Sequence, residues 1–256
     1  MRNKITYTLI LTGLLFISSY SLVNAEGGSS LLRKKNDDPK NVVKLQLGSL
    51  FFGALHFQYE RALTSKISVA LGASYLIPRS LPIAKYYEFD STRINESNLS
   101  GFSLTPEVRF YLGKKDAPRG FYIAPYMRYN NYSMDFDVDS RVNLKTGQKN
   151  VEKNFVGEGK YTSIGGGVMI GAQWLIINKI SIDWWILGLG FNSTKMELVS
   201  RGDFSKLDLS NSVNEINSFD SPLINAKGYA DDKEIRAELT LPGLAFRGGL
   251  TIGYAF

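Results

Sequence analysis

His56 is the single histidine of the chain, and it alternates with Gln58 and Glu60 along a segment with the two-residue periodicity of a β-strand. A histidine near a carboxylate is part of the arrangement that a Ser–His–acid hydrolase uses. The sequence order gives no nucleophile elbow around a serine, however. We therefore interpret His56, Gln58 and Glu60 as polar residues that line the inside of a sheet and bond to their neighbours. A hydrolase that uses His56 remains the alternative.

Charged residues recur on the same face of several predicted strands. A buried ion without a partner costs several kcal/mol, so charges inside a narrow barrel must pair with one another. An ion-selective pore and a plug of salt bridges both fit this pattern, and a narrow lumen favours the plug. The predicted lumen residues are Lys44, His56, Gln58, Glu60, Glu107, Arg109, Arg128 and Arg247.

Metal and cofactor chemistry has little support in the sequence. Asp135, Asp137 and Asp139 alternate along a strand, but Ser140 and Thr146 stand where an EF-hand requires glycine and glutamate. A solvated strand is the favoured interpretation, and a weak surface cation site is the alternative. The absence of cysteine excludes disulfides and thiolate metal sites. We predict no catalysis, no cofactor and no metal.

The elements that position these residues are strands. From Asn41 onward the apolar residues recur with period two, and long polar gaps alternate with short ones. The pattern predicts an all-β, eight-stranded antiparallel up-and-down transmembrane β-barrel in residues 41–256. The predicted strands are 42–50, 53–62, 66–77, 101–112, 120–134, 160–176, 180–198 and 243–256. In the seventh strand, Trp184-Trp185-Ile186-Leu187 breaks the alternation and predicts a bulge or a register change.

Three long polar gaps, 78–100, 135–159 and 199–242, predict outer loops, and the short gaps predict periplasmic turns. Alternation in 234–240 and 195–199 predicts that these hairpins protrude as β-structure. Exposed loops on a rigid scaffold carry most binding functions, so an unknown surface partner would bind there. Loops that only shield the mouth of the barrel are an equal alternative.

Both ends of the chain indicate export. Arg2 and Lys4 precede an apolar stretch that ends in Val23-Asn24-Ala25, which predicts a signal peptide in residues 1–25. Residues 26–40 predict a flexible periplasmic leader. The chain ends on an alternating strand whose apolar face carries Ile252, Tyr254 and Phe256.

Several segments resemble small outer-membrane β-barrels of Gram-negative bacteria. The segments are Asn41-Val42-Val43-Lys44-Leu45, Gln58-Tyr59-Glu60-Arg61, Pro106 to Leu112, Gly120 to Tyr126 and the C-terminal strand. They resemble an uncharacterised family in particular, and the size is similar to that of the eight-stranded OmpA and OmpX type. The resemblance implies that Ile252, Tyr254 and Phe256 form a signal for the barrel-assembly machinery. A resemblance to outer-membrane acyl hydrolases would require the arrangement His-x-Ser. This chain has Gln58 in the position of that serine.

The formal charge of +6 at pH 7 comes without a helix-turn-helix, zinc-finger or ribonucleoprotein motif, so nucleic-acid binding is not predicted. We predict an integral outer-membrane protein with both termini in the periplasm, outer-membrane lipid around it and a structural or surface-interaction role. A lipid-modifying hydrolase and a narrow pore remain the alternatives. A soluble barrel with a ligand cavity is a third hypothesis.

Overall fold

The computed structural model describes residues 38–80, 88–89, 92–144, 146–147, 151–218, 221 and 223–256. The predicted signal peptide and residues 26–37 of the predicted leader lie outside the described residues, and so do Tyr86 and Tyr87 of the first long gap. Of the described helices, none has the length and hydrophobicity needed to cross a bilayer.

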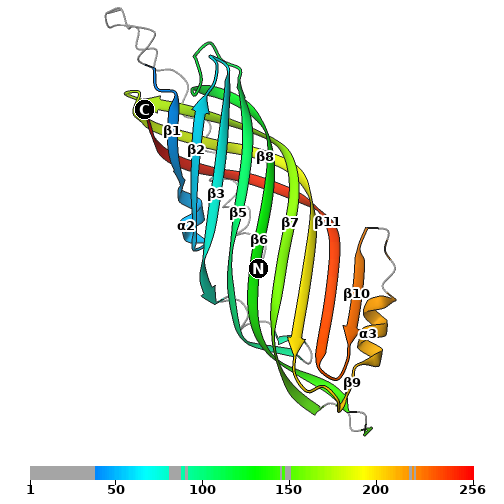
Figure 1. Cartoon of the computed structure of the whole chain (residues 1–256). Helices are drawn as coiled ribbons and strands as arrows, with labels where there is room; N and C mark the ends of the chain where they lie inside the picture. The colour runs from blue at the N-terminus through cyan, green and yellow to red at the C-terminus, as the bar shows by residue number, and fades with distance from the viewer. Residues whose placement is uncertain are drawn as a thin grey trace, which may run out of the picture. The chain divides into compact units, whose positions relative to one another are not determined.

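Eight antiparallel strands close into a barrel, as the sequence predicted (Figure 1). Each strand pairs with the next along the chain, and the last pairs with the first through Val42–Ala255 to Gln46–Thr251. The strands of the ring are β1 (Asn41–Gln46), β2 (Ala54–Ala62), β3 (Ile67–Ser80), β5 (Thr92–Tyr111), β6 (Gly120–Leu144), β7 (Val151–Ile176), β8 (Ile180–Arg201) and β11 (Glu234–Ala255). The remaining elements are α2 (Leu47–Phe51), β4 (Glu88–Phe89), β9 (Leu207–Asp208), α3 (Ser210–Asn217) and β10 (Asn225–Ala230).

The first predicted strand, 42–50, is wrong at its end because β1 stops at Gln46 and the chain enters helix α2. Leu47, Leu50 and Phe51 have the three- and four-residue spacing of a helix, not the alternation of a strand. Ser49 donates a hydrogen bond from Oγ to the Gln46 carbonyl at 2.8 Å, which holds the first turn. The chain therefore passes from β1 to β2 through a helical turn.

Much of the predicted loop structure is also strand. Residues 92–100, 140–144 and 151–159 continue β5, β6 and β7, so the predicted loops 78–100 and 135–159 are wrong over these parts. The strand extension favoured at Asp135, Asp137 and Asp139 is present in β6. In β6, the outward apolar residues end with Met127 and Tyr129, and beyond them the large apolar residues, Tyr132 and Met134, face inward. This exchange of faces interrupts the alternation, and the sequence analysis took the interruption for the end of the strand. The predicted β-extensions at 195–199 and 234–240 are confirmed.

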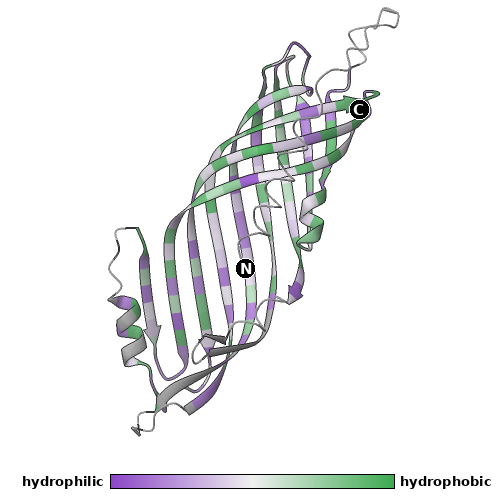
Figure 2. Cartoon of the chain, turned by 180° about the vertical axis from the view of Figure 1, so that it is seen from behind, coloured by the Kyte–Doolittle hydropathy of each residue, from purple (hydrophilic) through white to green (hydrophobic). Residues whose placement is uncertain are grey.

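The two faces of the barrel body differ sharply in polarity. In β5, Phe102, Leu104 and Phe110 lie on the exposed outer face, whereas Thr105 and Arg109 are fully buried on the inner face. Figure 2 shows hydrophobic and hydrophilic residues alternating along the strands. The polar residues therefore point into the lumen and the apolar ones outward.

The predicted irregularity in the seventh strand is confirmed as a β-bulge in β8. Leu187 pairs with Ile170 and Trp185 with Gly171, so Ile186 has no place in the ladder to β7. The pairing with β11 shifts at the same level, between Arg247 and Gly249. As a result, Trp185 is buried in the lumen and Trp184 is exposed on the outer face.

The short connections after β2, β5 and β7 lie at the end of the barrel where β1 begins and β11 ends. Ile177 and Asn178, between β7 and β8, both have positive φ (51° and 58°), as a two-residue hairpin turn requires. Asp38, from the end of the predicted leader, lies beside this turn: Arg119 Nη2 contacts its carboxylate at 2.8 Å, and Asn178 donates to it at 3.3 Å.

Candidate functional site

A cluster of ion pairs fills the lumen of the barrel body. Lys44 of β1 forms ion pairs with Glu60 of β2 and, at 2.7 Å, with Asp183 of β8. Arg109 of β5 contacts the same two carboxylates through Nη1, at 3.1 Å to Glu60 and 2.7 Å to Asp183. All four side chains are fully buried, so these charges depend on one another for stabilisation.

A second carboxylate group adjoins the first through Arg109. Its Nη2 lies 2.5 Å from Glu107, and Glu107 also forms an ion pair with Arg247 of β11. Gln58 bridges Glu107 and Arg109, because its Nε2 donates to Glu107 at 2.9 Å and its Oε1 accepts from Arg109 at 2.9 Å. The Arg247 guanidinium stacks over Trp185 at 4.1 Å, which shields this side of the cluster.

Neutral polar groups complete the coordination of the charges. Gln173 Oε1 accepts from Lys44 at 2.7 Å and from Arg109 at 2.9 Å. Tyr111 donates to Glu60 at 2.6 Å, and Tyr122 donates to Asp183 at 2.7 Å. Tyr122 lies across Gly171, where a Cβ would come within 2.4 Å of the tyrosine ring, so glycine is needed there to admit it.

The cluster contains three cations and three carboxylates, namely Lys44, Arg109 and Arg247 with Glu60, Glu107 and Asp183. Its charges therefore balance within the cluster. With Ser68, Tyr122 and Gln173, each of the eight strands of the ring supplies at least one side chain to it. This arrangement, which we call the lumen plug, ties the strands together and occupies the lumen with paired charge.

The predicted lumen residues all lie on inner faces, but they divide into two groups. Lys44, Gln58, Glu60, Glu107, Arg109 and Arg247 form the lumen plug. His56 and Arg128 lie outside its ion pairs. Asp183 is not among the predicted lumen residues. Its alternation with Ser181 indicates the inner face, but the apolar run Trp184 to Leu187 interrupts that pattern immediately after it. Gln173 and Tyr111 also lie on inner faces and bond to the charges, although neither is among the predicted lumen residues.

His56 and Arg128 line a polar pocket of about 210 Å³ next to the lumen plug. The pocket is also lined by Gln46, Ser74, Ser103, Asn130, Tyr132, Trp185 and Arg247. Arg128 donates from Nε to Thr105 Oγ1 at 3.3 Å, and among the described residues it forms no ion pair. His56 packs edge-on against Trp185, with 5.5 Å between the ring centroids.

The geometry around His56 differs from that of a Ser–His–acid site. His56 Nε2 has no hydrogen-bond partner among the described residues, although Ser74 is its cross-strand neighbour. The lining of the pocket contains no carboxylate that could orient the imidazole. Among the described residues, no serine and no carboxylate is hydrogen-bonded to His56 Nε2.

The residues of the predicted assembly signal lie together on the outer face of β11. Ile252 and Tyr254 are about half exposed, and the Tyr254 ring stacks on Phe256 with 6.4 Å between centroids. Phe256 exchanges two backbone hydrogen bonds of 2.9 Å with Asn41. The strand that closes the barrel thus presents one apolar stripe to its surroundings.

The three aspartates of β6 lie in the strand extension that the sequence analysis favoured. Asn154 Nδ2 donates to Asp137 at 2.5 Å and to Asp139 at 2.9 Å. In the described part of the chain, no group of three or more acidic, histidine or cysteine side chains has an arrangement suited to a metal ion.

The fold and the lumen define the class: an eight-stranded antiparallel β-barrel with paired charges inside and large apolar side chains on its exterior. The chain belongs to the family described as "Protein of unknown function (DUF3575)", whose model matches residues 47–211. The crystal structure of Acinetobacter baumannii CarO is similar to this chain with a TM-score of 0.37 and 10% sequence identity, covering 86% of this chain and 98% of that one. No curated protein matches the sequence.

Proposed function

We propose that the chain is an integral outer-membrane protein whose role is structural or lies in surface interaction, without catalysis. The observation that carries this proposal is the polarity of the barrel body. Large apolar side chains are exposed on the outer face of the ring, while six ionised groups are buried within it. Contact with water would be unfavourable for the exposed apolar side chains. Lipid around the ring would solvate these side chains and leave the ionised groups inside paired with one another.

The end of the apolar belt supports a membrane boundary. Asn131, Thr162, Lys195 and Thr240 face outward and pair in register across β6, β7, β8 and β11. On the same strands, the outward residues closer to the short turns include Met127, Ile164, Phe191 and Leu244. These four side chains are exposed and apolar. The strands therefore leave the apolar environment at one common level and continue into water.

The proposed orientation places the short turns and both ends of the barrel in the periplasm. The extensions of β5, β6, β7, β8 and β11, with α3 and β10, would then lie outside the cell. A surface partner would bind at the segments 78–100, 135–159 and 199–242.

The lumen plug supports a closed barrel rather than the narrow pore of the alternative hypothesis. The geometry around His56 likewise favours a non-catalytic role over the acyl hydrolase. Likeness to the OmpA and OmpX type, use of the barrel-assembly machinery through Ile252, Tyr254 and Phe256, and export through a signal peptide belong to the same proposal.

Membrane fractionation followed by gel electrophoresis with and without boiling tests the proposal. We expect the protein in the outer-membrane fraction, with a band that changes mobility on boiling because the closed barrel resists detergent at low temperature. A soluble periplasmic protein without this shift would refute membrane insertion. Steady ion conductance of the purified protein in planar bilayers would refute the closed lumen.

A further inference from the structure

The strand extensions carry an apolar inner face, the reverse of the barrel body. Tyr132, Tyr161, Met196 and Leu239 pair in register across β6, β7, β8 and β11. Two residues further out, Met134, Gly159, Leu198 and Ala237 form a second row in register. The rings of Tyr132 and Tyr161 lie 5.9 Å apart. These two rows make a continuous apolar wall.

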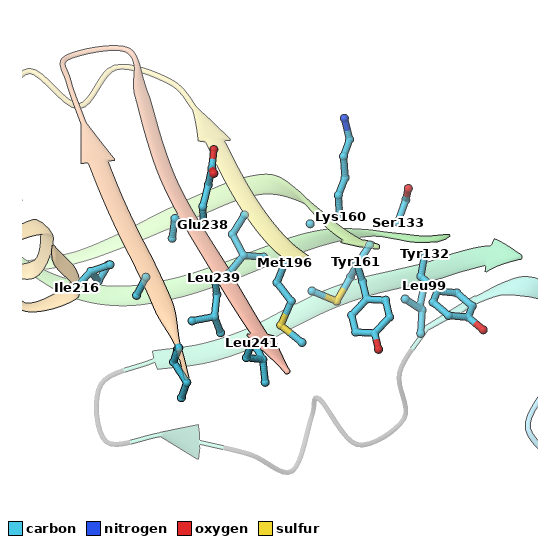
Figure 3. A pocket seen from close by; sticks show the side chains of 16 residues that line it. Leu99, Tyr132, Ser133, Lys160, Tyr161, Met196, Ile216, Glu238, Leu239 and Leu241 are labelled. Atoms are coloured by element: carbon cyan, nitrogen blue, oxygen red, sulfur yellow. The ribbon is translucent and has the colours of Figure 1, made fainter. Parts of the chain in front are cut away.

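The opposite face of the same extensions is polar. Figure 3 shows the side chains of Met196, Leu239 and Tyr161 on one side of the sheet, and those of Ser133, Lys160 and Glu238 on the other. Glu238 forms an ion pair with Lys195 at 3.5 Å on this outer side. A sheet with its polar face outward in water requires a cover for its inner face, since large exposed apolar patches are binding sites or liabilities.

Helix α3 and strand β10 provide part of this cover. Asn217 binds both backbone groups of Gly228, donating to its carbonyl at 3.0 Å and accepting from its N–H at 2.8 Å. This clamp places Ile216 beside the apolar wall. A cavity of about 860 Å³ remains between wall and cover, lined by Leu99, Tyr161, Met196, Leu198, Leu239 and Leu241 among others (Figure 3). Its volume falls in the range of small-molecule sites.

The apolar cavity adjoins the polar pocket of the barrel body. Tyr132 lines both of them. Strand β6 presents Arg128, Asn130, Tyr132 and Met134 inward in succession, which spans about 20 Å at the rise of a β-strand. Because Tyr132 lines both, the polar pocket and the apolar cavity lie next to each other along β6, like the two ends of one elongated site.

The polar end carries excess positive charge. Arg128 and Arg247 line it and no carboxylate does. Arg247 is paired with Glu107 through Nη1, but its Nε and Nη2 have no hydrogen-bond partner in the described structure, and neither does His56 Nε2. His56 and Arg247 are each only 5% exposed. Buried donors without partners are rare, and an anion between them would satisfy them.

We propose that this site binds a long-chain fatty acid, with its carboxylate at Arg128 and Arg247 and its hydrocarbon chain in the apolar cavity. A peptide would bring backbone N–H and C=O groups against an almost wholly apolar wall, where they would lack partners. A neutral lipid would leave Arg128 without a counterion and the free N–H groups of Arg247 without an acceptor. This ligand site goes beyond the surface-interaction role and can be tested in detergent, separately from the location of the protein.

Trp185 provides a reporter, because it lines the polar pocket while Trp174 and Trp184 lie on the outer face. In a W174F/W184F parent in maltoside detergent, stearate with a nitroxide close to its carboxylate should quench Trp185 saturably. Stearate with the nitroxide near its methyl end should quench it less. Unlabelled palmitate should reverse the quenching, and palmitate methyl ester should compete about ten-fold more weakly.

Two variants separate the ends of the site. Ala237→Phe fills the apolar cavity and should weaken stearate binding about ten-fold, whereas Leu244→Phe, outward on the same strand, should leave it unchanged. Arg128→Gln should weaken binding about ten-fold, and Arg128→Lys should retain most of it. A heat-dependent mobility shift shows that each variant is folded.

Absence of saturable quenching, or quenching that Ala237→Phe leaves unchanged, would overturn the proposed site. Equal competition by the acid and its methyl ester would overturn the placement of the carboxylate at the arginines.

Discussion

Asp183→Asn is the substitution that examines the lumen plug most sharply. Asp183 is fully buried and accepts from Lys44, Arg109 and Tyr122, each at 2.7 Å, and from Trp185 Nε1 at 3.1 Å. Asparagine keeps the shape but removes the negative charge, which leaves three cations facing two carboxylates. Breaking a buried ion pair by removing one partner costs about 3–5 kcal/mol. We expect a loss of that size in the free energy of unfolding.

Urea titration of the protein in lipid vesicles, followed by tryptophan fluorescence and by the gel shift, measures this loss. Asp135→Asn makes the same chemical change on the exposed face of β6 and should alter the free energy by less than about 0.5 kcal/mol. A second substitution, Lys44→Gln, restores the charge balance when combined with Asp183→Asn. The double variant should be more stable than the sum of the single losses predicts, by about 0.5–3 kcal/mol. If Asp183→Asn and Asp135→Asn were equally mild, paired buried charge would not hold the barrel together.

Three further predictions concern the belt, His56 and the β10–β11 turn. Val168→Arg, on the outer face of β7, should destabilise the protein in vesicles by about 2–4 kcal/mol, whereas Lys160→Arg should change it by less than about 0.5 kcal/mol; equal effects in urea titrations would contradict a lipid-facing belt. His56→Ala should leave phospholipid composition unchanged in mass spectrometry of cells that overproduce the protein, and a turnover that depends on His56 would revive the hydrolase. The Tyr229 hydroxyl and the backbone N–H groups of Lys233 and Glu234 lower the pKa of Asp231, so its stabilisation of the turn is present above the usual aspartate pKa and is lost as pH falls through the lowered value. Hydrogen exchange in residues 229–236 should therefore increase at acidic pH relative to the intrinsic rate, and Asp231→Asn should remove the pH dependence.

The alternation of side chains predicted the barrel body well. It placed Glu60, Glu107 and Arg109 on inner faces, and the requirement that buried charges pair predicted their ion pairs. The same rule could not identify their partners, because register between distant strands decides that Lys44 meets Asp183. The break in alternation in Trp184-Trp185-Ile186-Leu187 did locate the bulge. Asp183 and Trp185 face the lumen, and the outward phase resumes at Leu187 because Ile186 is the extra residue.

Sequence analysis failed where the environment of one strand changes along its length. The inward residues of β6 change from Arg128 and Asn130 to Tyr132 and Met134, while the outward ones change from Met127 to Ser133. The two-residue period continues along β6, but the large apolar residues move from the outer face to the inner face. A prediction that follows apolar residues on one face therefore ends the strand at this point. The elongated ligand site was missed for the same reason, because the inner face of β6 is polar at one end of the site and apolar at the other.

The most direct measurement of the central claim uses the natural absence of cysteine in this chain. Glu238→Cys and Leu244→Cys place single thiols on the outer face of β11, on either side of the level marked by Thr240. In intact cells, a membrane-impermeant maleimide should label Glu238→Cys and spare Leu244→Cys, and a hydrophobic maleimide dissolved in the membrane should label Leu244→Cys. Equal labelling of both positions by the impermeant reagent would contradict a barrel that crosses the membrane with an extension in water.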